Sequence, residues 1–246
     1  MDIEKLIREV TEEIGGQPVA DSFRPAASAA GVVSKLEHSL LIPDLHEKTV
    51  LEACAEARRY GIAAVCIPPY FVSRAKQALR GSGVAVCAAL GVPNALFSAE
   101  GRLADAKASL LCGADELDVS INAMAVKSGY PGDAEKDLAD VVRAAKGKAA
   151  VKACVELALF SEEEKQAVLR MVIRCGAAYV KIQNVLSGKG ADVTDIRFVR
   201  GIIGNNAGIK IDGGVKTLEK AEEIISGGAD RIGLTATFKI AAEAER

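Results

Sequence analysis

Three near-identical junctions constrain the fold of this chain more than any other feature of its sequence. They are Cys112-Gly113-Ala114-Asp115-Glu116-Leu117, Cys175-Gly176-Ala177-Ala178-Tyr179-Val180 and Gly227-Gly228-Ala229-Asp230-Arg231-Ile232. In each one, a glycine that suits the left-handed end of a helix follows an amphipathic helical segment, and an apolar strand segment begins at once. A chain that returns from helix to strand in this way builds parallel strands joined by helices.

Strand and helix segments alternate from residue 33 onward. The strands are expected near 33–41, 63–69, 84–91, 115–122, 149–157, 178–184, 208–213 and 230–235, and the helices near 45–60, 72–80, 99–112, 134–146, 162–175, 193–204 and 217–227. Eight such units close into a barrel, so we predict an α/β fold, the (β/α)8 or TIM barrel. The main rival, an open doubly wound sheet, would carry a Gly-x-Gly-x-x-Gly turn after an early strand, and the sequence has none.

The 246 residues are expected to form a single domain, 1–246, in which residues 1–32 are a helical leader. Apolar residues recur on one stripe of residues 2–14, and Gly15-Gly16-Gln17-Pro18 ends that helix. We expect the leader to cover one end of the barrel or to contact a second subunit. Two later helix starts have the form of a capping box, Asp44 with Glu47 and Ser161 with Glu164.

Composition argues against several classes of function. The formal net charge of -2 gives no reason to expect a nucleic-acid partner or an anionic membrane surface, and no apolar run approaches the roughly 20 residues that span a bilayer. The N-terminus is charged and does not resemble a signal peptide. The six cysteines form no Cys-x-x-Cys pair, and two histidines are too few for a His-rich zinc site. A cytoplasmic protein without a metal or an organic cofactor is expected.

Two lysines define the candidate chemistry. Lys181 and Lys210 each lie between two β-branched residues, so side-chain alternation places both on the inner face of neighbouring strands. Two ammonium groups at close range lower each other's pKa, which makes an amine nucleophilic near neutral pH. The pattern predicts a Schiff-base enzyme, and alternation allows either lysine to carry the imine.

The same alternation directs further polar side chains inward, where ordinary barrels place branched apolar ones. They are Glu37, Ser39, Glu116, Asp118, Ser120, Asn122, Lys152, Cys154, Glu156, Gln183 and Asp212. Near the C-terminal mouth such charges are typical of an active site, with Asp118 held by Lys210 as a proton shuttle. The alternative is a set of buried ion pairs in which Asp118 and Glu156 only neutralise the lysines.

The loops after the last two strands form a candidate phosphate site. Gly213 and Gly214 precede Lys216, and glycine-rich turns bind phosphate through backbone N–H groups. A tight turn without a ligand would have the same sequence. Cys66 is either a small buried hydrophobe or a pocket wall open to reactive aldehydes. His38 is expected to face the helix layer.

Several stretches, in order, resemble the deoxyribose-phosphate aldolase family from about Lys35 to Thr237. They are residues 36–41, 64–69, 113–118, 179–181, 208–210 with 213–217, and 231–233. The resemblance implies a class I aldolase that reversibly cleaves 2-deoxyribose 5-phosphate into acetaldehyde and glyceraldehyde 3-phosphate. It implies that Lys181 forms the Schiff base, Lys210 lowers the pKa of that amine and Asp118 takes part in proton relay. It also implies a homodimer or a higher homo-oligomer that acts on a small aldehyde or sugar phosphate.

The sequence departs from the family pattern at positions that bear on the substrate. Glu37 replaces an aspartate, Asp212 replaces a small neutral residue, and Ile182-Gln183-Asn184-Val185 replaces Thr-Ser-Thr-Gly. The residues expected to bind substrate are Glu37, Ser39, Cys66, Glu156, Asp212, Gly213, Gly214, Lys216, Gly233 and Thr235. Two alternatives stay open. One is an aldolase of the same family for a different acceptor aldehyde, including an unphosphorylated one, and the other is a non-catalytic barrel that binds a sugar phosphate.

Overall fold

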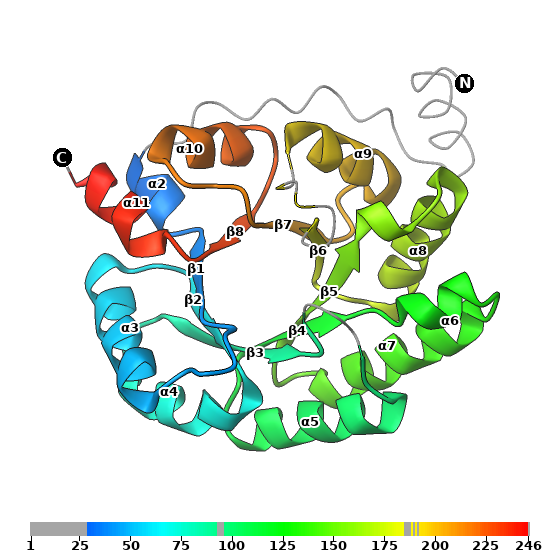
Figure 1. The fold of residues 1–246 in the computed structure, drawn as a ribbon, viewed down its shortest axis with the longest axis horizontal. Helices are drawn as coiled ribbons and strands as arrows, with labels where there is room; N and C mark the ends of the chain where they lie inside the picture. The colour runs from blue at the N-terminus through cyan, green and yellow to red at the C-terminus, as the bar shows by residue number, and fades with distance from the viewer. Residues whose placement is uncertain (1–28, 93–95, 185–187, 189, 191, 246) are drawn as a thin grey trace.

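Eight parallel strands close into one barrel in the order β1 to β8 (Figure 1). The computed structural model describes residues 29–92, 96–184, 188, 190 and 192–245. The strands are β1 (Leu36–Ser39), β2 (Ala64–Ile67), β3 (Ala85–Leu90), β4 (Glu116–Ser120), β5 (Ala150–Glu156), β6 (Tyr179–Gln183), β7 (Gly208–Asp212) and β8 (Arg231–Leu234). The predicted (β/α)8 barrel is confirmed, and each observed strand lies inside the predicted range.

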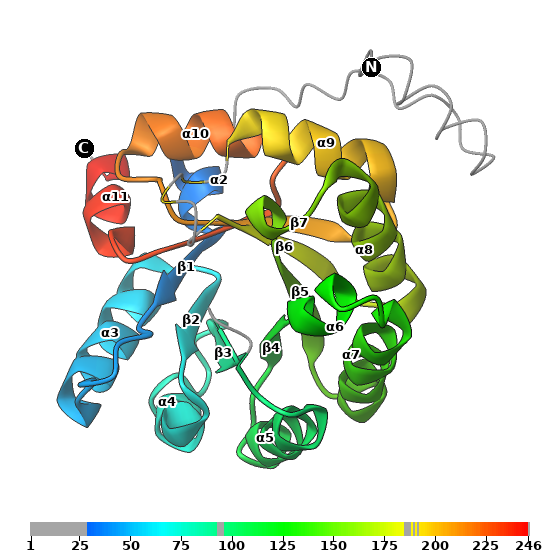
Figure 2. The ribbon, with the colours of Figure 1, turned by 45° about the vertical axis from the view of Figure 1, so that its right-hand side comes forward.

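Helices surround the barrel as an outer ring (Figures 1 and 2). They are α2 (Ala29–Val33), α3 (Glu47–Tyr60), α4 (Val72–Ala78), α5 (Ala99–Leu111), α6 (Ala123–Lys127), α7 (Pro131–Ala145), α8 (Glu162–Cys175), α9 (Val193–Ile203), α10 (Leu218–Ser226) and α11 (Thr237–Ala244), with 3-10 turns η1 (Pro69–Phe71) and η2 (Leu157–Leu159). Within the described ranges, no helix is both long and apolar enough to cross a membrane.

The start of the chain differs from the prediction. Residues 1–28 of the predicted leader lie outside the described residues. Residues 29–33 form α2, which spans the end of the predicted leader and the start of the predicted first strand. Val32 and Val33 of this helix are buried in the core. Burial requires apolar side chains in a short helix and in a strand alike, so these two valines could not distinguish the two structures.

The glycine junctions adopt the predicted conformation. Gly113, Gly176 and Gly228 have φ angles of 93°, 80° and 109°, which glycine adopts without steric cost. The capping box at Ser161 is confirmed. The capping box predicted at Asp44 is wrong, because α3 begins at Glu47 and its N-cap is His46, whose side chain makes no capping hydrogen bond.

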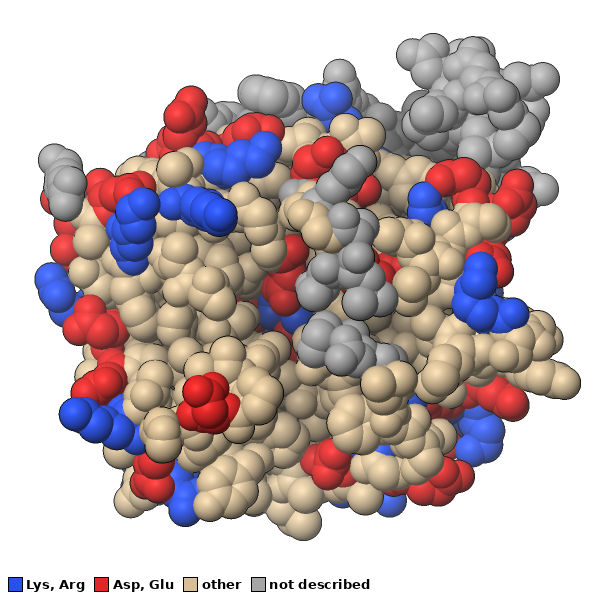
Figure 3. Space-filling view, in the orientation of Figure 1, with Lys and Arg blue, Asp and Glu red and all other residues tan. Residues whose placement is uncertain are grey.

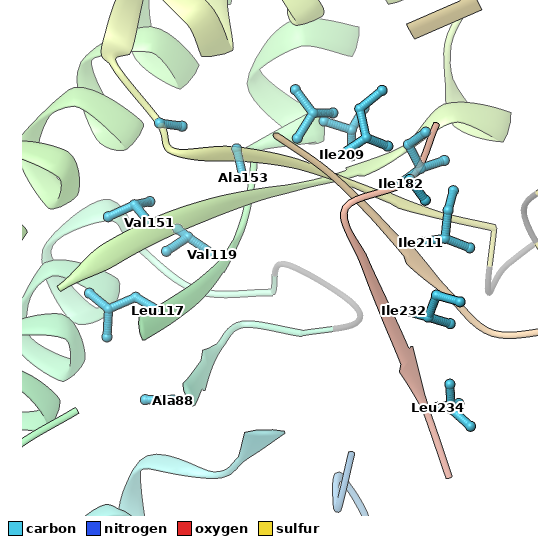
Figure 4. Close-up of a cluster of buried hydrophobic side chains, with 14 of the residues drawn as sticks. Ala88, Leu117, Val119, Val151, Ala153, Ile182, Ile209, Ile211, Ile232 and Leu234 are labelled. Carbon is cyan, nitrogen blue, oxygen red and sulfur yellow. The ribbon is translucent and has the colours of Figure 1, made fainter. Parts of the chain in front are cut away.

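The hydrophobic core lies between the strands and the helices. Figure 4 shows Leu117, Val119, Ile182 and Ile211 among the side chains that the strands direct to this layer, and all of them are buried. His38 also faces the helices, as predicted: its Nδ1 lies 3.1 Å from the Thr237 hydroxyl. The core therefore leaves the inner face of the strands to other side chains.

Candidate active site

The inner face of the barrel is asymmetric. On β2 and β3 it carries the small side chains of a separate cluster, Ala64, Cys66, Cys87 and Ala89. On β6 and β7, Lys181 and Lys210 are direct partners in the strand register, so two long side chains start at the same height. The small residues leave room for the lysines to extend across the barrel. Figure 3 shows blue and red side chains in a hollow at the centre of the ring, surrounded by mostly uncharged surface.

Seven charged side chains form one continuous series of alternating sign inside the barrel. In spatial order they are Glu116, Lys152, Glu37, Lys210, Asp118, Lys181 and Asp212, and the successive N–O distances are 2.5, 2.6, 2.6, 2.8, 2.7 and 2.5 Å. The inner five side chains are 0% exposed, whereas the two ends, Glu116 and Asp212, are 9% and 15% exposed. The series therefore reaches solvent only at its ends.

The charges of this series nearly cancel. Four carboxylates face three ammonium groups, and Arg231 lies 3.9 Å from Glu116 as a fourth cation. Such pairing offsets much of the cost of burying each ion. The ion pairs of the structural alternative are thus present, with Asp118 between Lys181 and Lys210 as that alternative expected.

The pKa of Lys181 shifts in the direction opposite to the prediction. Burial lowers this pKa and the nearby Lys210 lowers it too, as expected from like charges. The carboxylates of Asp118 and Asp212 outweigh both effects and raise the pKa of Lys181 well above its ordinary value. Burial likewise lowers the pKa of Lys210, but Asp118 and Glu37 raise it well above the ordinary value. Lys181 is therefore an ammonium group in this structure and must lose a proton before it can act as a nucleophile.

The buried carboxylates shift the other way. Burial raises the pKa of Asp118, but Lys181 and Lys210 outweigh burial and hold it well below its ordinary value. Glu37 behaves in the same way, since Lys152 and Lys210 lower its pKa to about 2 despite burial. One oxygen of Asp118, Oδ2, accepts hydrogen bonds from both Lys181 and Lys210. This shared oxygen is the geometry that a proton shuttle between the two lysines requires.

Two thiols also contact Asp118. The Sγ atoms of Cys66 and Cys87 lie 3.6 and 3.2 Å from its two oxygens. Burial raises the pKa of the Cys87 thiol well above its ordinary value, so this sulfur is a neutral donor. Cys66 is wholly buried, which favours its interpretation as a small buried residue. These cysteines and Asp118 could together ligate a metal, as could Glu37, Cys87 and Glu116, but a lysine ammonium group already binds the carboxylates of both groups.

Most of the predicted substrate-binding residues lie at or beyond the C-terminal ends of the strands, whereas Glu37 and Cys66 are wholly buried inside the barrel. Ser39, Glu156 and Asp212 are the last residues of β1, β5 and β7. Beyond them, Gly213, Gly214, Lys216 and Thr235 are exposed.

Glycine is required at two of these mouth positions. A Cβ atom on Gly233 would lie 2.9 Å from Lys210 Cε and 3.0 Å from Asp212 Cγ, so only glycine leaves room for both side chains. A Cβ atom on Gly214 would lie 2.7 Å from the Cα of Gly190, because the loops after β6 and β7 touch. The N–H group of Gly213 donates to the Gly233 carbonyl at 3.2 Å, so it is not open to a phosphate.

Three residues of the cluster, Glu116, Lys152 and Cys87, received no role from the sequence. Lys152 was predicted to face inward but was not connected to any partner, although it binds both Glu37 and Glu116. Cys87 was not singled out. Its position between Val86 and Ala88, which pack in the outer core, would have placed it on the inner face by alternation.

Comparison with known proteins agrees with this fold. No family model matches the chain. A protein from Coccidioides immitis that was solved as a deoxyribose-phosphate aldolase superposes with a TM-score of 0.87 and 27% identity, over 100% of this chain and 99% of that chain. The tetrameric deoxyribose phosphate aldolase from Aeropyrum pernix superposes with a TM-score of 0.80 over the same shares, at 23% identity, which supports the fold alone.

The closed barrel with lysines in its interior, together with these likenesses, defines a (β/α)8-barrel aldolase, which is a lyase. The curated deoxyribose-phosphate aldolase from Bacillus cytotoxicus is 37% identical over 215 residues, which cover 87% of this chain and 96% of that protein. The chain belongs to the deoxyribose-phosphate aldolase family.

Proposed function

We propose that this protein reversibly cleaves 2-deoxy-D-ribose 5-phosphate into acetaldehyde and D-glyceraldehyde 3-phosphate, with Lys181 as the Schiff-base lysine. The observation that carries the proposal is the position of Lys181 Nζ, buried between two carboxylates at 2.7 Å from Asp118 and 2.5 Å from Asp212. A protonated imine on this nitrogen keeps the positive charge of the ammonium group. The same carboxylates therefore stabilise the iminium, which withdraws electrons from the neighbouring carbon.

In the cleavage direction, the neutral amine of Lys181 attacks C1 of the open-chain sugar and water leaves to give the iminium. A base removes the proton of the C3 hydroxyl, the C2–C3 bond breaks, and glyceraldehyde 3-phosphate departs. The remaining enamine takes a proton on carbon, and hydrolysis of the resulting imine releases acetaldehyde. Asp118 and Lys210 are the proposed proton relay, because Asp118 Oδ2 lies 2.8 Å from Lys210 Nζ and 2.7 Å from Lys181 Nζ.

One observation favours a second candidate function, an aldolase for an unphosphorylated or otherwise different acceptor. The carboxylate of Asp212 stands at the barrel mouth and would repel a phosphate, and the Gly213 N–H group is already bonded. Lys216 is exposed beside this turn and is the proposed counter-charge for a phosphate.

Steady-state cleavage of 2-deoxyribose 5-phosphate and of 2-deoxyribose separates these functions. The first proposal expects a higher kcat/KM for the phosphate ester, and Lys216→Gln should reduce only that value. A preference for the free sugar would favour the second candidate. If neither sugar is cleaved, borohydride trapping with acetaldehyde separates the two remaining interpretations: an aldolase for another acceptor forms an adduct on Lys181, and a barrel that binds a sugar phosphate without catalysis forms none.

We also propose that residues 1–246 form one domain, that the protein is a cytoplasmic homo-oligomer and that it needs no cofactor. The six cysteines are free thiols, which supports a reducing compartment. The relative from Aeropyrum pernix is tetrameric, and the exposed apolar side chain of Leu111 is available for a subunit contact. Light scattering of the purified chain tests the oligomer, and a monomer mass would contradict it.

A further inference from the structure

We propose that Asp212 is a catalytic acid–base residue of its own, separate from Asp118. It accepts the proton that Lys181 must lose before attack on an aldehyde, and it returns that proton to the departing water. The inference rests on the proposed function, because it presumes an imine at Lys181. Aspartate stands here where the family resemblance implies a small neutral residue, so the role does not follow from that resemblance.

The two carboxylates that flank Lys181 differ in their surroundings. Asp118 is 0% exposed and contacts two thiols and three lysines, and the lysines hold it in its charged form. Asp212 is 15% exposed and lies closer to Lys181, with 2.5 Å between Oδ2 and Nζ. A proton taken by Asp212 has a path to solvent, whereas one taken by Asp118 stays among buried charges.

The second oxygen of Asp212 points to the same role. Among the described residues, Oδ1 has no hydrogen-bond partner, although it is buried, and Lys210 Nζ lies 3.8 Å from it. A buried acceptor without a hydrogen-bond donor destabilises the folded protein, and a bound ligand that donates a hydrogen bond would satisfy it. When Lys181 attacks a carbonyl, the new hydroxyl forms on the carbon bonded to Nζ. A carboxylate that already binds Nζ therefore has this hydroxyl within hydrogen-bond reach, and Oδ1 is free to accept it.

The fold holds Asp212 in this position. It is the last residue of β7 and pairs in register with Gly233 of β8. The missing side chain of Gly233 provides the space that the carboxylate occupies, since a Cβ atom there would lie 3.0 Å from Asp212 Cγ. The carboxylate is thus directed from the rigid end of a strand toward Lys181 rather than from a loop.

Every proton is accounted for when Lys181 and an aldehyde form the iminium. The ammonium group of Lys181 gives one proton to the Asp212 carboxylate, and the nitrogen lone pair forms a bond to the carbonyl carbon. The carbonyl π electrons move to oxygen, which takes the second nitrogen proton and becomes a hydroxyl. Asp212 returns its proton to this hydroxyl, the C–O bond breaks, and the nitrogen lone pair forms the C=N bond. An ammonium group and an aldehyde have become an iminium and water, and Asp212 is again a carboxylate.

The test compares the rate of imine formation in the wild type and in Asp212→Asn. Each protein is mixed with acetaldehyde, reduced with borohydride after timed intervals at pH values from 5 to 9, and assayed for the Lys181 adduct by mass spectrometry. Loss of the proton acceptor should slow the step by about 100-fold or more at every pH. The control is Glu219→Gln, an exposed residue of α10 that changes the net charge equally, and it should form the imine at the wild-type rate.

A merely electrostatic role of Asp212 predicts the opposite change. Asp212 raises the pKa of Lys181, so loss of its charge alone would produce more neutral amine and faster imine formation at low pH. That result would overturn the proposal. Absence of an adduct in the wild type at every pH would instead refute the proposed function.

Chemical rescue provides a second variant in case Asp212→Asn does not fold. In Asp212→Ala, added formate should restore the rate of imine formation if a proton acceptor is missing. Under the electrostatic role, formate would slow the step, because an added anion raises the pKa of Lys181 again. A rate that falls or stays constant with formate contradicts the proposal.

Discussion

Replacement of Asp118 by asparagine probes the electrostatics of the site most directly, because its Oδ2 atom binds two buried ammonium groups at once. The distances are 2.7 Å to Lys181 and 2.8 Å to Lys210. At an effective dielectric constant of about 20, each pair contributes about 6 kcal/mol of Coulomb energy before relaxation. Loss of this charge lowers the pKa of Lys181, while the carboxylate of Asp212 continues to raise it.

Three measurements follow for Asp118→Asn. Urea unfolding at pH 7 should show a loss of about 3–5 kcal/mol, because two buried cations lose a partner. The pH midpoint for borohydride trapping of Lys181 should move to lower pH, because the amine becomes neutral more readily. Turnover of 2-deoxyribose 5-phosphate should fall by about 10²- to 10⁴-fold, because the shared oxygen no longer moves protons. A trapping midpoint and a stability equal to those of the wild type would refute the electrostatic reasoning.

Three further predictions concern neighbouring features. Lys210→Leu should raise the pKa of Lys181, since Lys210 lowers it, and should move the trapping midpoint to higher pH; an unchanged pH profile would contradict that role. Burial lowers the pKa of the His38 side chain from 6.5 to about 4. Between pH 6.5 and pH 4, His38 therefore binds a proton in the unfolded chain but not in the folded one. As the pH falls through this range, the free energy of unfolding of the wild type should decrease by up to about 3 kcal/mol more than that of His38→Gln. If the free energies of unfolding of the two proteins, measured with urea, change in parallel with pH, titration of His38 does not contribute to the pH dependence of stability. Gly233→Ala should reduce kcat/KM by at least about 10-fold and destabilise the fold by about 1–3 kcal/mol, because its Cβ atom would lie 2.9 Å from Lys210 Cε; wild-type activity and stability would contradict the close packing.

The sequence predicted the barrel because its signals are local. Glycine junctions such as Gly176 mark the return from helix to strand, and side-chain alternation places Lys181 and Lys210 inside. The five-residue helix α6 was missed because it spans too few residues for a helical period to be recognised. The eight-residue helix α11 was also missed. The helix α2 has only five residues as well, and its apolar C-terminal end was assigned to a strand.

The chemical state of the lysines could not be predicted in the same way. Alternation gives the face on which a side chain lies but no distance across the barrel. Asp118 comes from β4, two strands away from Lys181 on β6, and Glu37 reaches Lys210 from β1. These contacts between distant strands decide the net pKa shift. Reasoning from two adjacent lysines alone therefore gave the correct direction for their mutual effect and the wrong direction for the sum.

The central claim is that Lys181 carries the covalent intermediate. Borohydride reduction in the presence of acetaldehyde, followed by peptide mass spectrometry, tests it directly. We expect one ethyl adduct, on Lys181, that is absent from Lys181→Arg and still forms in Lys152→Met. An adduct on Lys210 or Lys152 in place of Lys181, or no adduct in a folded protein that still cleaves 2-deoxyribose 5-phosphate, would contradict the claim.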